Sequence, residues 1–122
     1  MKILLIGASG CFGTEFKKAC KNSKIRISFF PSKKLNITDY INLKKKISLI
    51  RPKIIINSSA LVGINQCEAK YEKAFSINSV GSLYLSKLCN EMNIILVQTS
   101  THAVFDGKKL NSYTENDIPM PN

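Results

Sequence analysis

The stretch Lys2-Ile-Leu-Leu-Ile-Gly7-Ala-Ser-Gly10-Cys-Phe-Gly13 decides the fold of this 122-residue chain. After Lys2 comes a short, continuous aliphatic run, the pattern of a strand that is buried on both faces. The three glycines have the spacing of a turn that brings backbone N–H groups to a pyrophosphate at a helix N-terminus. A purely structural turn is the alternative, but such a turn seldom needs three spaced glycines. The stretch therefore predicts a dinucleotide site.

Outward from this stretch, strand-sized apolar runs alternate with helical patterns. Strands are predicted over 2–6, 25–30, 54–57 and 94–98, and helices over 14–20, from Thr38 or Asp39 to Ile50 and, with a bend, over 67–93. This alternation is typical of right-handed βαβ units around a parallel sheet. We expect the strand order 25–30, 2–6, 54–57, 94–98, with room for a short extra strand near 35–37. Residues 108–122 have no periodicity and are predicted to be loop.

The fold class that follows is α/β, a Rossmann-type doubly wound parallel sheet, truncated after the fifth-strand region when the short extra strand is counted. With 44% hydrophobic residues and ten Gly and Pro together, the chain has the composition of one folded domain rather than of a disordered protein. It contains no apolar run of membrane-spanning length, and its first residues do not resemble a secretory signal. We therefore expect a cytoplasmic protein without a membrane partner.

The net charge of +10 raises the question of nucleic-acid binding. Residues 1–66 carry 13 of the 18 basic side chains and only two acids, so the whole excess lies in this half. However, 16 of the 18 are Lys, aromatic residues do not accompany them, and only Arg26 and Arg51 could act as bidentate phosphate readers. Lysine-rich coding bias on a solvated surface is the simpler interpretation, and a nucleic-acid partner is not favoured.

The cysteines and the single histidine do not predict a metal site. Cys11, Cys20, Cys67 and Cys89 form no Cys-x-x-Cys pair, and His102 alone cannot complete a zinc finger. In a cytosolic chain these cysteines are expected to be reduced.

The end of the second strand bears on the choice of cofactor. An NAD site would place an acid here for the ribose hydroxyls, but none occurs before Asp39. Ser32, Lys33 and Lys34 could instead hold a 2′-phosphate, which favours NADP and leaves NAD as the alternative. These lysines could also be part of the general lysine excess.

Several further motifs resemble one family. The glycine spacing is that of the extended short-chain dehydrogenases/reductases, and the other landmarks are similar to those of the dTDP-4-dehydrorhamnose reductases. Arg51-Pro-Lys-Ile-Ile-Ile-Asn57-Ser-Ser-Ala60 is similar to the family's strand beside the nicotinamide ribose, and Ala74-Phe-Ser-Ile-Asn78 to its helical Asn motif. The most specific match is Ser100-Thr-His-Ala-Val-Phe-Asp-Gly107, where the family has Ser-Thr-Asp-Tyr-Val-Phe-Asp-Gly.

The resemblance implies an NAD(P)-binding Rossmann domain over residues 1–122 and an NADPH-dependent reduction of a 4-keto nucleotide sugar. Thr101 would be the catalytic residue that bonds the keto oxygen, and His102, in place of the family's Asp, is interpreted as an ordinary polar residue. The implied cofactor-binding residues are Gly7, Ser9, Gly10, Cys11, Phe12, Gly13, Ser32, Lys33, Lys34, Asn36, Ile37, Ser58, Ser59, Ala60, Asn78, Thr99 and Ser100.

The family's catalytic Tyr-x-x-x-Lys pair is expected to follow just beyond Asn122, together with a substrate domain. The one such spacing in the sequence, Tyr40 to Lys44, precedes the third strand and is interpreted as a coincidence. The chain alone is therefore expected to be inactive, with a nucleotide sugar as partner only in a longer chain. The alternative function is a non-catalytic NADP-binding regulatory or interaction module. An exposed edge strand over 94–98 predicts self-association.

Overall fold

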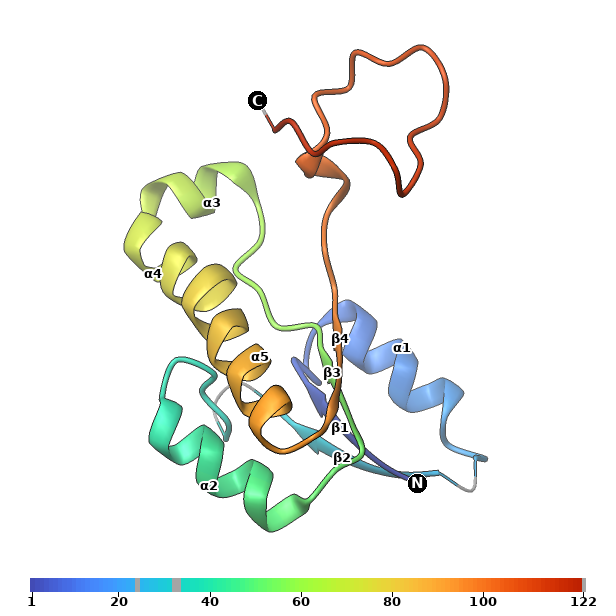
Figure 1. Ribbon diagram of the computed structural model, residues 1–122, viewed down its shortest axis with the longest axis vertical. Helices are drawn as coiled ribbons and strands as arrows, with labels where there is room; N and C mark the ends of the chain where they lie inside the picture. The colour runs from blue at the N-terminus through green and yellow to red at the C-terminus, as the bar shows by residue number, and fades with distance from the viewer. Residues whose placement is uncertain (24, 32–33, 122) are drawn as a thin grey trace.

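The computed structural model describes residues 1–23, 25–31 and 34–121 and contains one parallel four-stranded sheet (Figure 1). Its strands are β1 (Lys2–Ile6), β2 (Arg26–Phe30), β3 (Ile54–Asn57) and β4 (Ile95–Gln98), in the order β2-β1-β3-β4. This order confirms the predicted topology. All the pairs are in register along their lengths, so the carboxyl ends of β1, β3 and β4 meet at one edge.

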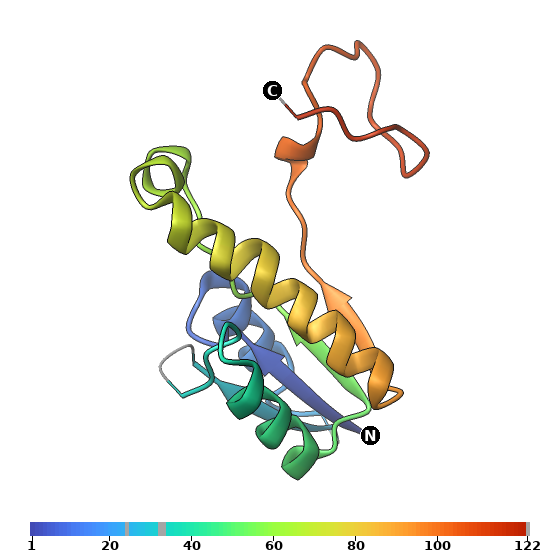
Figure 2. The same ribbon diagram turned by 60° about the vertical axis from the view of Figure 1, so that its left-hand side comes forward.

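Helices cover both faces of this sheet. Figure 1 shows α1 on one face and α2 and α5 on the other, while Figure 2 shows α5 crossing its face of the sheet obliquely. The helical elements are α1 (Cys11–Ala19), α2 (Tyr40–Ile50), α3 (Ile64–Ala69), α4 (Tyr71–Phe75), a π-helical segment (Ser76–Gly81), α5 (Ser82–Glu91) and a 3₁₀ turn (His102–Val104). The predicted bend is confirmed, because Lys70 leaves helical geometry between α3 and α4.

The core lies between the sheet and the α2 and α5 layer. It contains ten buried residues: Leu4, Ile6, Leu35, Ile37, Leu43, Ile47, Ile55, Leu85, Leu88 and Cys89. Alternation along β1 sends Leu4 and Ile6 to this side, while Ile3 and Leu5 face α1. The buried strand pattern expected of a parallel sheet is therefore present in β1.

The ends of α2 illustrate how local sequence sets the element bounds. Asp39 is the N-cap, and its side chain accepts a 3.0 Å hydrogen bond from the Asn42 N–H. At the other end Arg51 adopts a left-handed conformation and donates its N–H to Ile47 O. Pro52 follows, and because proline has no N–H it cannot continue the helix.

The suggested extra strand over 35–37 is absent from the described residues. Leu35 and Ile37 are buried and Asn36 is exposed, which is the alternation that a strand would show. The backbone instead forms local turns, since the Leu35 N–H bonds Pro31 O and the Asp39 N–H bonds Asn36 O. The alternation here reflects two apolar side chains that fill the core rather than sheet pairing.

The α1 face of the sheet is only partly covered. Ile95 is 63% exposed and Val97 is 46% exposed, and by register both lie on the same side as Leu5. β4 is also the edge strand, so an apolar face and an unpaired backbone edge occur together. No helix within the described ranges is long and apolar enough to cross a membrane.

Candidate functional site

The glycine turn is built by two close backbone approaches. Gly7 has φ +83°, and a Cβ on it would lie 2.6 Å from Ser59 N and 2.7 Å from Ser58 C. A Cβ on Gly13 would lie 2.6 Å from Gly7 O and 2.7 Å from the Cα of Ala8. Gly7 therefore brings the turn against the loop after β3, and Gly13 brings α1 against the turn.

Gly10 has a different environment, which suits a ligand. Its nearest neighbour for an added Cβ is Gly7 O at 3.4 Å, an ordinary contact, and Ser9 to Phe12 are all exposed. Gly10 is the N-cap of α1 and has no side chain to bond the free N–H groups, and the first turn contains no acid. An anion such as a pyrophosphate is the ligand that this uncapped helix N-terminus fits.

The sequence expectation that α1 begins at Thr14 was three residues late. The helix starts at Cys11, directly after Gly10, so Gly13 lies in its first turn. The third glycine is thus part of the helix itself, as the close packing against Ala8 requires.

The carboxyl ends of β1, β3 and β4 are joined by hydroxyl groups. Ser58 directs both its N–H (3.1 Å) and its Oγ (3.0 Å) to Ile6 O. Thr99 does the same one strand further on, with its N–H and Oγ1 each 3.1 Å from Asn57 O. The residues after β3 and β4 therefore each bond the last carbonyl of the neighbouring strand, which joins the three strand ends.

Asn57 stands at the centre of this edge and is fully buried. Its Oδ1 accepts from the Ser59 N–H at 3.1 Å and from Ser59 Oγ at 2.5 Å, while its Nδ2 donates to Gln98 Oε1 at 2.9 Å. Gln98 in turn donates through Nε2 to Thr99 O at 3.0 Å. Ser58, Ser59 and Thr99, all predicted to bind cofactor, thus use their side chains to hold the edge together.

Asn78 fixes the loop that follows β3. Its Oδ1 accepts from the Leu61 N–H at 2.9 Å and its Nδ2 donates to Leu61 O at 3.0 Å. Because Asn78 lies in the π-helical segment, this amide pair links that helix to the loop after Ala60. A role in cofactor binding for Asn78 would therefore be through the position of the loop.

The predicted adenine side has one exposed and one buried residue. Asn36 is exposed, and its Oδ1 accepts from the N–H and Oγ1 of Thr38 at 3.1 and 2.9 Å, which leaves its NH₂ group for a base. Ile37 is 3% exposed and lies against Gly81, so only its backbone could face a ligand. Ser32 and Lys33 lie outside the described residues, and the neighbouring Lys34 is exposed.

Thr101 and His102 lie beyond the end of β4. Thr101 is the N-cap of the 3₁₀ turn, and its Oγ1 accepts from the Ala103 N–H at 3.2 Å. A hydroxyl that accepts one bond still has a hydrogen to donate, so Thr101 keeps a donor for a ketone oxygen. Both Thr101 and His102 are exposed, and Ala60 and Ser100 are exposed as well.

Tyr40 and Lys44 are occupied elsewhere, on the α2 layer. Tyr40 OH donates to Glu91 Oε1 at 3.3 Å, and Lys44 Nζ bonds Glu91 Oε2 at 3.0 Å. This bond lowers the pKa of Glu91 below its usual value and raises the pKa of Lys44 above its usual value. This Tyr-x-x-x-Lys spacing thus joins α2 to the end of α5.

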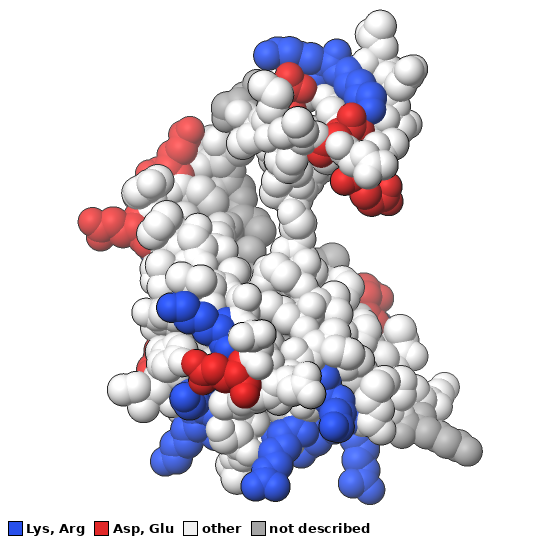
Figure 3. Space-filling view, viewed as in Figure 1, with Lys and Arg blue, Asp and Glu red and all other residues white. Residues whose placement is uncertain are grey.

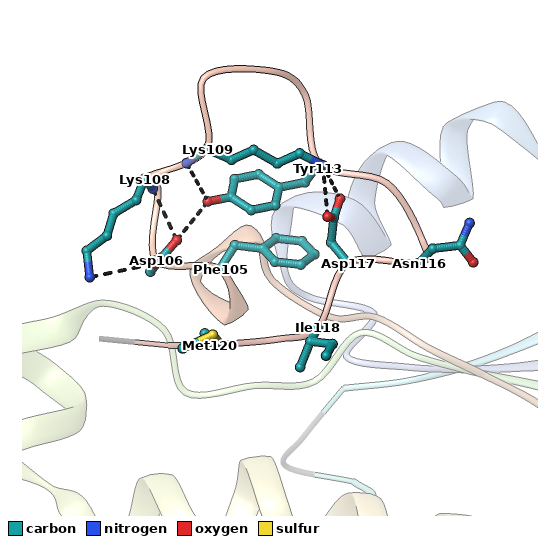
Figure 4. Close-up of a pocket in the computed structure, with 9 residues that line it drawn as sticks. All are labelled: Phe105, Asp106, Lys108, Lys109, Tyr113, Asn116, Asp117, Ile118 and Met120. Atoms are coloured by element: carbon teal, nitrogen blue, oxygen red, sulfur yellow. Dashed lines mark hydrogen bonds and ion pairs between the residues drawn. The ribbon is translucent and has the colours of Figure 1, made fainter.

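The segment after β4 folds into a compact loop beyond the carboxyl edge of the sheet (Figure 2). Figure 4 shows the ring of Phe105 stacked on Tyr113, whose OH donates to Asp106 at 2.8 Å. Lys109 Nζ reaches both carboxylate oxygens of Asp117, at 2.8 and 2.7 Å, and Asp117 also accepts from the Thr114 N–H. These contacts surround a hollow of about 550 Å³.

The Asp117 contacts make this loop sensitive to low pH. The hydrogen bond from Lys109 and that from the Thr114 N–H hold the pKa of Asp117 below its ordinary 3.8. A lowered pKa means that the contacts are intact above about pH 4 and are lost as the pH falls through the folded-state pKa. We expect Lys109→Met to raise the pH at which the Thr114 amide signal moves in ¹H–¹⁵N NMR titrations.

Lys108→Met is the matched control for this titration, because Lys108 is 78% exposed and lies 3.6 Å from Asp106 rather than near Asp117. Identical Thr114 titrations in the wild type and Lys109→Met would contradict the assigned cause.

A group of basic residues lies away from the glycine turn. Lys2 and Arg26 begin strands, Lys53 precedes β3, and Lys17 and Lys18 lie in the last turn of α1, so all belong to the amino edge of the sheet. Figure 3 shows basic side chains gathered at this lower end of the molecule. Since helix C-termini also meet there, these cations lie near partial negative charges.

Two parts of the site were not predicted from the sequence. The Asn57–Gln98 bond joins residues 41 positions apart, and the Lys109–Asp117 pair closes the terminal loop. One available signal was Asn57 itself, because a polar residue at the end of a buried aliphatic strand needs bonding partners.

Comparison with known proteins gives a consistent result. The family described as "RmlD substrate binding domain" matches residues 1–122. The spore coat polysaccharide biosynthesis protein SpsK of Bacillus subtilis is 31% identical over 116 residues, which are 95% of this chain and 41% of that protein.

Two solved structures are also similar. A dTDP-4-dehydrorhamnose reductase of Clostridium acetobutylicum superposes with a TM-score of 0.94 at 32% identity, over 99% of this chain and 43% of that one. The dTDP-4-dehydrorhamnose reductase of Bacillus anthracis, solved in complex with NADP, has a TM-score of 0.92 at 28% identity, over 98% and 43%. The chain thus spans less than half the length of these relatives.

Proposed function

Because this chain belongs to the RmlD substrate binding domain family, we propose that residues 1–122 form the NADP-binding part of a reductase that acts on a 4-keto nucleotide sugar. The observation that carries the proposal is the glycine turn. Gly7 and Gly13 hold the backbone close to Ser59 and Ala8, while Gly10 stays open at the uncapped start of α1. The Bacillus anthracis relative in complex with NADP supports the choice of cofactor.

In this proposal each loop at the carboxyl edge serves a different part of the dinucleotide. The free N–H groups of Cys11 to Gly13 receive the pyrophosphate, and the loop 58–60 lies on the ribose side. Lys34, with Ser32 and Lys33, holds the 2′-phosphate, which is consistent with the absence of an acid between β2 and Asp39. The bound cofactor would supply the hydride, while the protein supplies position.

Thr101 would donate its hydroxyl hydrogen to the ketone oxygen of the sugar. In the family a Tyr-x-x-x-Lys pair supplies the proton, and the one such spacing within residues 1–122 is engaged by Glu91. A positioned general acid contributes about 10²–10⁴ in rate, so residues 1–122 alone would bind cofactor without appreciable turnover. The second candidate function is a non-catalytic NADP-binding module, with which the bonding of Tyr40 and Lys44 to Glu91 is consistent for residues 1–122.

Titration of residues 1–122 against NADPH fluorescence tests the proposal, with NADH as the control ligand. We expect saturable NADPH binding, about tenfold tighter than that of NADH because the 2′-phosphate adds charge-assisted bonds. The absence of saturable binding to either dinucleotide would overturn both candidate functions. Reduction of a 4-keto nucleotide sugar by residues 1–122 alone would exclude the non-catalytic module.

A thiol footprint locates the bound cofactor independently. Cys11 is exposed in the glycine turn, whereas Cys89 is buried, and burial raises the pKa of the Cys89 thiol to about 11. NADPH is expected to slow alkylation of Cys11 by iodoacetamide and to leave Cys20, outside the turn, unchanged. Equal protection of both cysteines would place the ligand elsewhere.

We also propose that residues 1–122 self-associate through β4. The support is the coincidence of its free edge with the exposed Ile95 and Val97. Light scattering over a concentration series is expected to show oligomers that Ile95→Lys dissociates. Ile41→Lys, at a residue 80% exposed on α2, is the matched control and should leave them intact. A wild type that is strictly monomeric would contradict the proposal.

A further inference from the structure

The carboxyl edge of the sheet contains a set of side-chain bonds that the proposed roles do not use. Its members are Asn57, Ser58, Gln98 and Thr99, which we call the edge ladder. Ser58 bonds Ile6 O, Thr99 bonds Asn57 O, and the side chains of Asn57 and Gln98 bond each other. Ile6, Asn57 and Gln98 are register partners, so the ladder runs straight across three adjacent strands.

Asn57 is the member of the edge ladder whose side chain must find its hydrogen-bond partners within the protein. It is the only buried polar side chain among the described residues, with 0% exposure, and its oxygen and nitrogen both have protein partners. A buried amide with unmet bonds is costly, so the position of Asn57 determines where Ser59 and Gln98 lie. Ser59 belongs to the loop after β3, and Gln98 is the last residue of β4, directly before the segment that contains Thr101.

The residues that Asn57 joins lie next to different parts of the proposed site. Ser58 and Ser59 lie against the glycine turn, where a Cβ on Gly7 would meet their backbone at 2.6–2.8 Å. Gln98 leads through Thr99 to Thr101, the predicted partner of the ketone oxygen. The Asn57–Gln98 bond joins the side chains of these two segments, beside the bond from Thr99 Oγ1 to Asn57 O.

We infer that Asn57, through Gln98, is a positioning residue that sets the nicotinamide half of the cofactor site relative to the phosphate-binding turn. The inference rests on the proposed function. Asn57 itself touches no reacting atom, since it is buried beneath the loops. Replacing Asn57 should therefore reduce the contribution of the nicotinamide half to NADPH affinity. Binding of the adenosine half, by the glycine turn and the loop after β2, should be unchanged.

The test compares two ligands on residues 1–122, namely NADPH and adenosine 2′,5′-bisphosphate, which represents the adenosine half alone. Asn57→Ala and Gln98→Ala are each expected to weaken NADPH by about tenfold and to change the affinity for the bisphosphate by less than about twofold. The double variant should resemble Asn57→Ala, because both changes remove the same bond. Asn90→Ala and Gln66→Ala, at exposed residues, are matched controls that should change neither affinity.

Circular dichroism of each variant establishes that it is folded, and Gln98→Ala keeps the inference testable should Asn57→Ala fail to fold. Equal losses for both ligands, or no loss of NADPH affinity, would overturn the positioning role while leaving the proposed function in place. A wild type that binds neither ligand would instead overturn the proposed function itself.

Discussion

Replacing Gly13 with alanine is expected to weaken NADPH binding by about 100-fold and to lower the free energy of unfolding by about 2 kcal/mol. Helix propensity alone would favour alanine here by up to about 1 kcal/mol. The added Cβ, however, would lie 2.6 Å from Gly7 O and 2.7 Å from the Cα of Ala8. Both neighbours are backbone atoms, so α1 must move away from the turn and take its free N–H groups with it.

Gly107→Ala is the control for this substitution. Gly107 has φ +72° with no atom within 4 Å of an added Cβ, so alanine would cost about 1 kcal/mol of local strain without moving a neighbour. Its NADPH affinity should equal that of the wild type. Urea unfolding followed by circular dichroism measures the stabilities, and fluorescence titration measures the affinities. A Gly13→Ala protein that binds NADPH normally would refute the steric account of the turn.

Replacing Leu85 with alanine should destabilise the fold by about 3 kcal/mol, because the change leaves a cavity in the core. Leu85 is 0% exposed and packs within the cluster between the sheet and the α2 and α5 layer. Small domains are stable by only about 5–15 kcal/mol, so this is a large fraction of the total.

Leu83→Ala is the matched control on the same helix, since Leu83 is 52% exposed and its loss should cost less than about 0.5 kcal/mol. The measurement is the urea midpoint of each variant at unchanged slope. Equal midpoints for the two variants would contradict the assignment of the core.

The fold could largely be predicted from local sequence patterns. The aliphatic runs of β1 and β3 are buried as a parallel sheet demands, and Asp39 caps α2 as its position suggests. The suggested strand over 35–37 was wrong, because core-filling side chains in a turn can alternate in the same way as those of a strand. Leu35 and Ile37 alternate like a strand, but turns satisfy their backbone and their side chains fill the core.

The candidate site was likewise predictable from the sequence only in part. The turn from Gly7 to Gly13 was predictable, because its residues are neighbours in sequence and their chemistry is local. The bonds of Asn57 to Gln98 and of Asn78 to Leu61 join residues 41 and 17 positions apart. No periodicity carries such information, since it depends on which strands become neighbours.

The sequence by itself determined the class of fold, the positions of the strands and the glycine turn. These depend on hydrophobic periodicity and on glycine spacing, which act over a few residues. Only the tertiary structure decided that Lys2, Arg26 and Lys53 lie together at the amino edge. It also decided that Tyr40 and Lys44 bond Glu91 and that Asn57 lies buried at the centre of the carboxyl edge. The physical reason is that a parallel sheet brings together residues that are remote in the chain, and their hydrogen bonds and charges are matched only after the strands have paired.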